Sequence, residues 1–460
     1  MPIGRSMPSG PTVGKWLLSR PLMPSICFVL VMFASLCNTI DLEMGPKTGE
    51  EQIGLDFQVG LKLAIAMCCA MIGCWGLIQS PRVRRAFESL PGATLFALAI
   101  VLMVTASVAI DSVATQCRVA ALVNFGYLLF VPTALSVLGW RTMAKSILCG
   151  LAVYVVAAWT IYLAIPEMGV FQEQLGDDTA IARMGGLGHP NAVARIGVLT
   201  VLLSVSLMRR NPIESNASRQ RGSAIKSMGM YCLIALALGI TAAAISRTAI
   251  AAGILALMFL LSDRLFTRAG ITWVLSGMVL GIGVVLAALM FAGGGGAISD
   301  KLLSAGTKTG EIEEIASITG RTEIWAETIR LIRERPITGY GLNSAPILLE
   351  DYSQHAHNML LHVTLSGGLF AGALVLALLL WTMALGICSS EPLIRAIAAF
   401  ILLSGLVEDT ALDTFASPAT ILWLMILLYR PLKAGLKLAR SPIDSEGETP
   451  YNGELSRLPP

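Results

Sequence analysis

The chain has 460 residues, of which 55% are hydrophobic and only 14% are charged, whereas soluble domains carry roughly 25% charged residues. A soluble fold could not bury so much apolar surface, and we therefore predict a polytopic membrane protein. The formal net charge of +3 is small, and no basic patch is interleaved with aromatic residues, which argues against a nucleic-acid-binding protein.

Apolar runs predict the transmembrane helices. A bilayer core of ~30 Å requires about 20 apolar residues per helix. One helix over residues 230–262 would be ~50 Å long, and basic segments flank this stretch on both sides, so we predict two short helices with Arg247 at their outer tip. The predicted spans are 22–40, 58–79, 93–110, 119–138, 146–165, 191–208, 229–245, 248–262, 270–292, 359–386, 394–408 and 417–430.

The fold class that we predict is an all-α polytopic membrane protein with about 12 transmembrane helices and one long, partly helical outer loop. Basic residues gather in alternate connecting segments, so the positive-inside rule places both termini in the cytoplasm. The predicted divisions are a cytoplasmic N-terminal segment (1–21), helices 1–9 (22–292), the outer loop (293–358), helices 10–12 (359–430) and a disordered cytoplasmic tail (431–460).

Two arginines on the predicted outer face are candidate anion ligands. Arg247 lies between two apolar helices, next to Ser246, which could donate a hydroxyl hydrogen bond. Arg321 begins an amphipathic helix predicted over residues 321–335, where its charge adds to the positive end of the helix dipole. The alternatives are an interfacial anchor for Arg247 and a solvated side chain for Arg321.

Histidines supply the candidate general base. His355, His357 and Asn358 stand where the outer loop meets the next span, and a histidine titrates near neutrality, so His357 could accept a proton from a hydroxyl. A metal site would need further ligands, and only Asp351 is close in sequence, so no metal is predicted. An interfacial histidine that only packs is the alternative.

Two further segments carry weaker signals. Arg183, His189 and Asn191 precede the sixth span and could shape a second anion contact. Tyr340 lies between two glycines in a tight turn that follows the amphipathic helix, where glycine permits positive φ or a close approach of the backbone.

The order of these motifs closely resembles the O-antigen ligase / O-antigen polymerase superfamily of bacterial inner-membrane glycosyltransferases. The resemblance covers roughly residues 183–372, and the first five spans match only by hydropathy. The family's His-Asn helix often carries a glutamate before its glycine pair, where this chain has Ser366. The motifs are Ser246-Arg247-Thr248, Gly320-Arg321-xxx-Trp325, Pro336-xx-Gly339-Tyr340-Gly341 and His357-Asn358, with Gly368 ten residues after Asn358.

The resemblance implies a GT-C-like fold in the bacterial inner membrane with a periplasmic active site. The implied reaction transfers a glycan from an undecaprenyl-diphosphate lipid to an acceptor hydroxyl, without cofactor or metal. Guanidinium groups pair with phosphate oxygens and stay charged, so Arg247 and Arg321 would stabilise the departing diphosphate and His357 would be the base. Predicted substrate-binding residues are Arg183, His189, Asn191, Ser246, His355, Asn358 and Tyr340.

The acceptor could be a lipid-A core sugar, another lipid-linked glycan or a protein, because ligases, polymerases and protein O-glycosylating enzymes share these motifs. A transporter or flippase is the alternative from another class. The spans lack the midplane acids and histidines that ion-driven transporters usually carry. A structural scaffold is disfavoured because the arginines gather on one face with a histidine.

Overall fold

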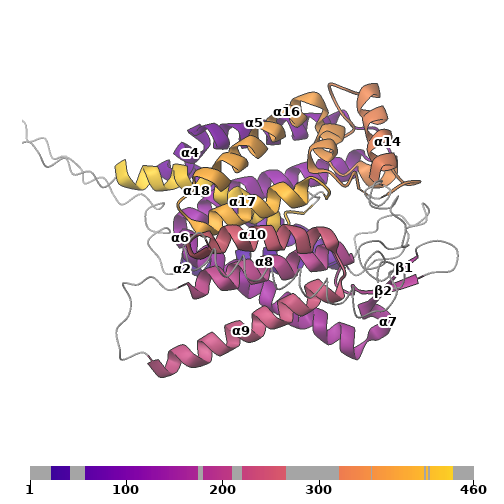
Figure 1. Cartoon of the computed structure of the whole chain (residues 1–460). Coiled ribbons are helices and arrows are strands. Elements are labelled where there is room, and N and C mark those ends of the chain that lie inside the picture. Colours follow the sequence, from indigo (N-terminus) through magenta and orange to yellow (C-terminus); the bar gives the residue numbers. More distant parts are fainter. Residues whose placement is uncertain are drawn as a thin grey trace, which may run out of the picture.

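The computed structural model describes residues 22–41, 57–174, 180–209, 220–265, 321–353, 355–408, 411–412 and 415–438. Within these residues the protein is a bundle of helices with one short β-hairpin (Figure 1).

The elements follow the chain in three groups. The first group is α2 (Leu22–Cys37), α3 (Phe57–Gln79), α4 (Pro81–Glu88), α5 (Leu90–Ser107), α6 (Ala114–Ala164) and α7 (Pro166–Gly169). The second is β1 (Val170–Gln174), β2 (Ala180–Met184), α8 (Pro190–Met208), α9 (Gln220–Ala243) and α10 (Arg247–Leu265). The third is α14 (Arg321–Glu334), α15 (Ala345–Leu348), α16 (Met359–Cys388), α17 (Pro392–Gly405) and α18 (Pro418–Leu438).

Helix α6 is the centre of the bundle and packs against α2, α3, α5, α8 and α18. Gly139 has a φ of 72° and breaks α6 into two stretches, which match two of the predicted spans. By length and composition, five helices of the described residues can cross a membrane: α3, α5, α6, α8 and α16. The protein is thus a helical membrane protein, while the total of twelve spans stays a prediction.

The structure confirms that residues 230–262 form two helices, because α9 ends at Ala243 and α10 begins at Arg247. The amphipathic helix is also confirmed, as α14. It buries Ile324, Thr328 and Ile332 of the predicted face, whereas Ile329 is exposed. The predicted span 270–292 and the first part of the outer loop, up to residue 320, lie outside the described residues.

The protein is mostly helical, as predicted, but it contains one short β-hairpin that the sequence analysis did not predict. Residues 170–174 and 180–184 pair as antiparallel strands, with Arg183 opposite Phe171. The sequence reasoning missed this hairpin because strands of five residues show too little periodicity to stand out between long apolar helices. Contacts between the strands, including an ion pair from Arg183 to Glu173, contribute to the pairing.

A break in α16 receives the turn that follows α14. Gly368 has a φ of 71° and interrupts α16, which leaves the carbonyls of the preceding turn without helical partners. The backbone N–H groups of Tyr340 and Gly341 donate to the carbonyls of Leu365 and Ser366 at 2.9 and 2.8 Å. The glycine-rich turn thus completes the hydrogen bonding of the broken helix and joins α14 to α16.

This junction has no room for side chains. A Cβ atom on Gly368 would lie 2.2 Å from the carbonyl oxygen of Ile337, and the positive φ is itself unfavourable for other residues. The segments that carry Arg321 and His357 are therefore held together by backbone contacts at the same end of the bundle as β1, β2 and α7 (Figure 1).

We predict that Gly368→Ala destabilises the protein by at least roughly 1–3 kcal/mol, the ordinary cost of a strained backbone, because the added methyl group also displaces the turn. The measurement is thermal denaturation in detergent. Gly60→Ala is the matched control, since nothing lies within 4 Å of a Cβ at that position. Equal melting temperatures for the two variants would contradict this account of the junction.

Candidate functional site

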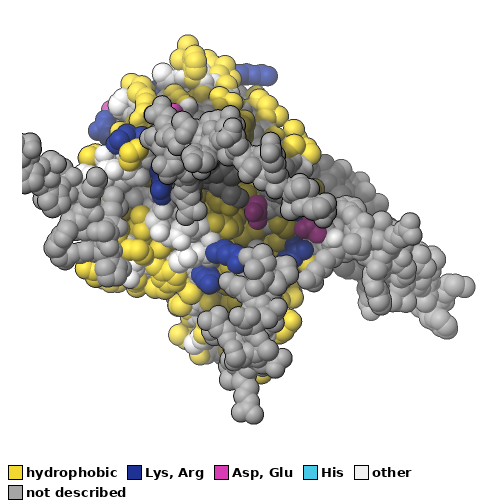
Figure 2. Space-filling model, turned by 90° about the vertical axis from the view of Figure 1, so that its left-hand side faces the viewer, with side chains coloured by type: hydrophobic (Ala, Val, Ile, Leu, Met, Phe, Trp, Pro, Cys, Tyr) yellow, Lys and Arg dark blue, Asp and Glu magenta, His cyan; other side chains and the backbone are white. Residues whose placement is uncertain are grey.

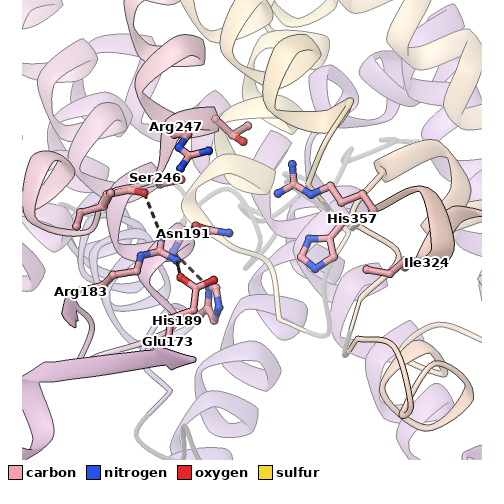
Figure 3. A pocket seen from close by; sticks show the side chains of 11 residues that line it. Glu173, Arg183, His189, Asn191, Ser246, Arg247, Ile324 and His357 are labelled. Atoms are coloured by element: carbon pink, nitrogen blue, oxygen red, sulfur yellow. Dashed lines mark hydrogen bonds and ion pairs between the residues drawn. The ribbon is translucent and has the colours of Figure 1, made fainter. Parts of the chain in front are cut away.

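A cavity of about 190 Å³ lies among segments that are far apart in the sequence. The hairpin, the N-terminus of α8, the turn between α9 and α10, the N-terminus of α14 and the loop before α16 all contribute to its wall (Figure 3). The lining residues are Glu173, Arg183, His189, Asn191, Ile245, Ser246, Arg247, Thr248, Arg321, Ile324 and His357.

The structure brings together the three residues for which the sequence predicted catalytic roles, since Arg247, Arg321 and His357 all line this cavity. Arg183, His189, Asn191 and Ser246, predicted to bind substrate, also line it. The cavity therefore gathers most of the candidate site residues from five separate segments of the chain.

Arg247 is positioned by the turn that joins α9 to α10. The helix begins at Arg247, and the hydroxyl oxygen of the buried Ser246 accepts a hydrogen bond from the N–H of Ala249 at 3.5 Å, as an N-cap residue does. An arginine at this position adds its charge to the positive end of the helix dipole, and the combination favours an anionic ligand.

Arg321 also begins a helix, and it faces a buried carboxylate. Its Nη2 lies 2.6 Å from Oε1 of Glu408, and the two side chains are only 13% and 7% exposed. A guanidinium has five N–H donors in a planar fork. Among the described residues Arg321 uses one nitrogen to bind Glu408, which leaves other donors to meet a ligand.

Glu408 contacts His357 as well. Oε2 of Glu408 lies 3.2 Å from Nδ1 of the histidine, and the other ring nitrogen, Nε2, lies 3.0 Å from Oγ of Ser353. The loop is tightly wound here, because His357 has a φ of 47°. The imidazole is therefore held from both sides, by a carboxylate and by a hydroxyl.

The charge of Glu408 decides which nitrogen of His357 carries the proton. Burial raises the pKa of the carboxyl, but a hydrogen bond from His357 and the charges of Arg195 and Arg321 outweigh burial and hold the pKa below its ordinary value. The group is thus a carboxylate and cannot donate, so Nδ1 of His357 must bear the hydrogen. In the neutral ring Nε2 is then the basic nitrogen, and the Ser353 hydroxyl donates to it.

His189 lines the cavity as a neutral ring. Burial lowers its pKa to about 4, and the nearby positive charge of Arg183 acts in the same direction. Its Nδ1 accepts a hydrogen bond from the N–H of Asn191 at 3.3 Å, so the hydrogen sits on Nε2. His189 therefore offers a hydrogen-bond donor without a charge.

Three of the predicted binding residues lie outside the cavity lining. The side-chain oxygen of Asn358 caps α16, and its amide donates to the carbonyl of Leu406 at 2.9 Å. Tyr340 is buried at the turn after α14 and donates to Glu334 at 3.1 Å. The ring of His355 stands at 6.3 Å from that of His357, edge to face.

The sequence analysis did not identify the two carboxylates of the site, Glu173 and Glu408. Glu408 contacts residues 87 and 51 positions away in the sequence, so no local motif points to it. Ser366, which stands where the family often has glutamate, is buried and donates to the carbonyl of His362 at 2.8 Å. The carboxylate that contacts the candidate base thus comes from the end of α17 and not from α16.

Three arginines line the cavity, and carboxylates pair with two of them: Glu173 with Arg183, and Glu408 with Arg321. The arginines outnumber the acids, so this group of side chains carries excess positive charge that suits an anion such as a phosphate. Among the described residues, no three His, Cys, Asp or Glu side chains lie close enough to hold a metal ion.

Comparison with known families agrees with the motifs. Residues 232–376 match the family model described as O-antigen ligase, which confirms the resemblance over the part of the chain that carries Arg247, Arg321 and His357. No match is found among curated proteins. The match over residues 232–376 supports, at the family level, a ligase-like membrane glycosyltransferase.

We predict that His189 stays neutral when the pH falls from 8 to 5. Since an unfolded histidine binds a proton near pH 6.5 and the folded one only near about 4, the folded state loses stability as the pH falls between these values. The measurement is a titration of ¹⁵N-histidine-labelled protein in detergent, with His189→Gln to assign its signals among the four histidines. A His189 ring that becomes protonated above pH 6 would contradict this.

Proposed function

We propose that this protein transfers a glycan from an undecaprenyl-diphosphate lipid to an acceptor hydroxyl, as an O-antigen ligase does. The observation that carries the proposal is the meeting, in one cavity, of two arginines that begin helices with the histidine held by Glu408. The match to the O-antigen ligase family supports it.

The donor's diphosphate binds between Arg247 and Arg321. When the bond between the anomeric carbon and the diphosphate breaks, negative charge develops on the leaving oxygen. Guanidinium groups remain charged and can pair bidentately with phosphate oxygens, and both arginines sit where a helix dipole adds to their charge. Ser246 and the neutral His189 supply further hydrogen bonds at the wall of the cavity.

His357 accepts the proton of the acceptor hydroxyl at Nε2. The acceptor oxygen forms a bond to the anomeric carbon, the bond to the diphosphate oxygen breaks, and the diphosphate leaves on the polyprenyl lipid. Glu408 keeps the hydrogen on Nδ1 and stabilises the imidazolium that forms. Since Ser353 now donates to Nε2, the acceptor hydroxyl takes the place of Oγ of Ser353 when it binds.

The acceptor that we propose is a sugar of the lipid-A core, which makes the protein a ligase. A lipid-linked repeat unit as acceptor would make it a polymerase, and a protein acceptor would make it an O-glycosylating enzyme. The same cavity can serve all three, because the arginines and the histidine act on bonds that these reactions share.

We place the reaction on the periplasmic face of the bacterial inner membrane. The cavity lies at the same end of the bundle as α14 and the hairpin, while α4 lies at the other end (Figure 1). Figure 2 looks onto that other end, where lysine and arginine side chains stand among apolar ones; α4 contributes exposed Arg82 and Arg84 there. The positive-inside rule assigns this basic end to the cytoplasm.

We expect Arg247→Ala, Arg321→Ala and His357→Ala each to abolish glycan transfer while the protein still inserts. Arg321→Lys should also impair transfer, because a point charge cannot replace the guanidinium fork. The measurement is surface-glycan transfer in cells that lack the native enzyme. Arg330→Ala is the control, since Arg330 lies on the same helix but is exposed and paired with Glu327. Normal transfer by all three alanine variants would remove the proposed mechanism.

We expect Glu408→Gln to lower the turnover number by about 10²–10⁴-fold, the usual contribution of general base catalysis, because an amide cannot hold the imidazolium. The donor KM should change less. The control is Glu350→Gln, at an exposed position. A turnover number that matches the wild type would show that His357 does not depend on Glu408.

Purified protein incubated with a polyprenyl-diphosphate glycan, candidate acceptors and a chelator tests the reaction class. Transfer that persists in the chelator is expected if the arginines neutralise the diphosphate, and the preferred acceptor distinguishes ligase from polymerase. Transfer that stops with the chelator and returns with added Mg²⁺ would contradict the arginine mechanism.

A further inference from the structure

Arg183 differs from the other two arginines of the cavity in how its guanidinium is used. All three of its nitrogens bond to the protein. Nε donates to the carbonyl of Ala244 at 2.8 Å. Nη1 donates to Oε2 of Glu173 at 2.6 Å and Nη2 to Oδ1 of Asn191 at 2.8 Å (Figure 3). The side chain is only 4% exposed. Arg183 therefore contacts the hairpin, α8 and the end of α9 at once.

The segment that Arg183 holds is the turn that carries Arg247. Ile245 has a φ of 49°, a left-handed conformation that costs a branched residue of order 1–3 kcal/mol and persists only when its surroundings impose it. The carbonyls of Ala244 and Ile245 lie just past the end of α9, where helical partners run out. Arg183 binds both, the second through Nη2 at 3.5 Å.

We propose that Arg183 is a positioning residue, which holds the strained turn at residues 244–246 so that Arg247 faces the cavity, and that it does not bind the diphosphate. The inference rests on the proposed function and assigns Arg183 a role different from the anion contact that the sequence predicted. A phosphate that bound Arg183 would have to displace the carboxylate of Glu173 and break bonds to Asn191 or to the turn. Arg321, by contrast, engages a single nitrogen with Glu408 within the described part of the chain.

The same guanidinium also fixes the orientation of Asn191. Because Oδ1 of Asn191 accepts from Arg183, its amide nitrogen faces the other way and donates to Oε1 of Glu408 at 3.0 Å. Glu408 in turn contacts Arg321 and His357. Arg183 thus supports both sides of the cavity. It contacts the Arg247 turn directly, and it acts on Glu408, the carboxylate beside His357, through Asn191.

Glu173→Gln separates a positioning role of Arg183 from a ligand role, because a ligand role predicts tighter donor binding and a positioning role predicts slower turnover without tighter binding. If Arg183 bound phosphate, removal of the competing carboxylate would free it and lower the donor KM. If Arg183 positions the turn, loss of the Glu173 carboxylate leaves the Arg183 side chain less firmly held. We then expect the turnover number to fall by about 10-fold or more with no gain in donor affinity. Glu167→Gln, an exposed acid beside the same hairpin, is the matched control.

Arg183→Lys completes the test. A lysine keeps the charge but cannot reach the two carbonyls, Glu173 and Asn191 together, so we expect a loss of about 10²-fold in transfer, the cost of a misplacement near 1 Å. Hydrogen exchange in detergent should become faster at the amides of residues 244–248 in this variant and not in Arg247→Ala. Wild-type exchange in Arg183→Lys, or tighter donor binding in Glu173→Gln, would overturn the proposal.

Arg247→Ala in the same assays distinguishes failure of this inference from failure of the proposed function. If Arg247→Ala retains transfer together with Arg321→Ala and His357→Ala, the proposed function falls. If Arg247→Ala abolishes transfer while Glu173→Gln binds the donor more tightly, Arg183 is itself a ligand and only the positioning role falls. A fluorescent polyprenyl-diphosphate glycan is the donor probe for these binding measurements.

Discussion

The carboxylate of Glu408 is the contact on which the cavity depends. One oxygen meets Arg321 and Asn191, and the other meets the ring of His357. A buried charge is costly unless it is paired and hydrogen-bonded, and Glu408, at 5% exposure, is satisfied from three directions. Because its partners come from α8, α14 and the loop before α16, the same group that orients the base also joins separate parts of the chain.

A second constraint is the broken helix. Gly368 opens α16 and exposes backbone groups that the turn after α14 satisfies. Inside a membrane protein, backbone groups must find partners within the protein, so a broken helix persists only where another segment completes it. The break requires glycine at position 368, because a side chain there would clash with the backbone of the turn. The backbone hydrogen bonds at the break fix α14 to α16. They therefore hold Arg321 near His357, in addition to the contacts that both side chains make with Glu408.

The three arginines that line the cavity differ in their surroundings. Arg183 is enclosed by protein acceptors, whereas Arg247 and Arg321 stand at helix N-termini on the cavity wall. The sequence around them does not reveal this difference, since glycine, serine or threonine stands within two positions of each arginine. The difference follows from the acceptors that the fold places nearby, which for Arg183 are Glu173, Asn191 and the backbone carbonyls of Ala244 and Ile245.

The sequence by itself determined the membrane class, the division at Arg247 into two helices, the helix that begins at Arg321 and the resemblance to the O-antigen ligase family, because apolar runs, helical spacing and short motifs are local properties. It also picked out Arg247, Arg321 and His357, whose residue types suit phosphate and proton chemistry. Only the tertiary structure decided that Glu408 holds His357 and that Arg183 is enclosed by Glu173 and the Arg247 turn. These choices depend on distances between residues tens of positions apart, and on which groups a buried charge can find as partners, so no local pattern in the chain encodes them.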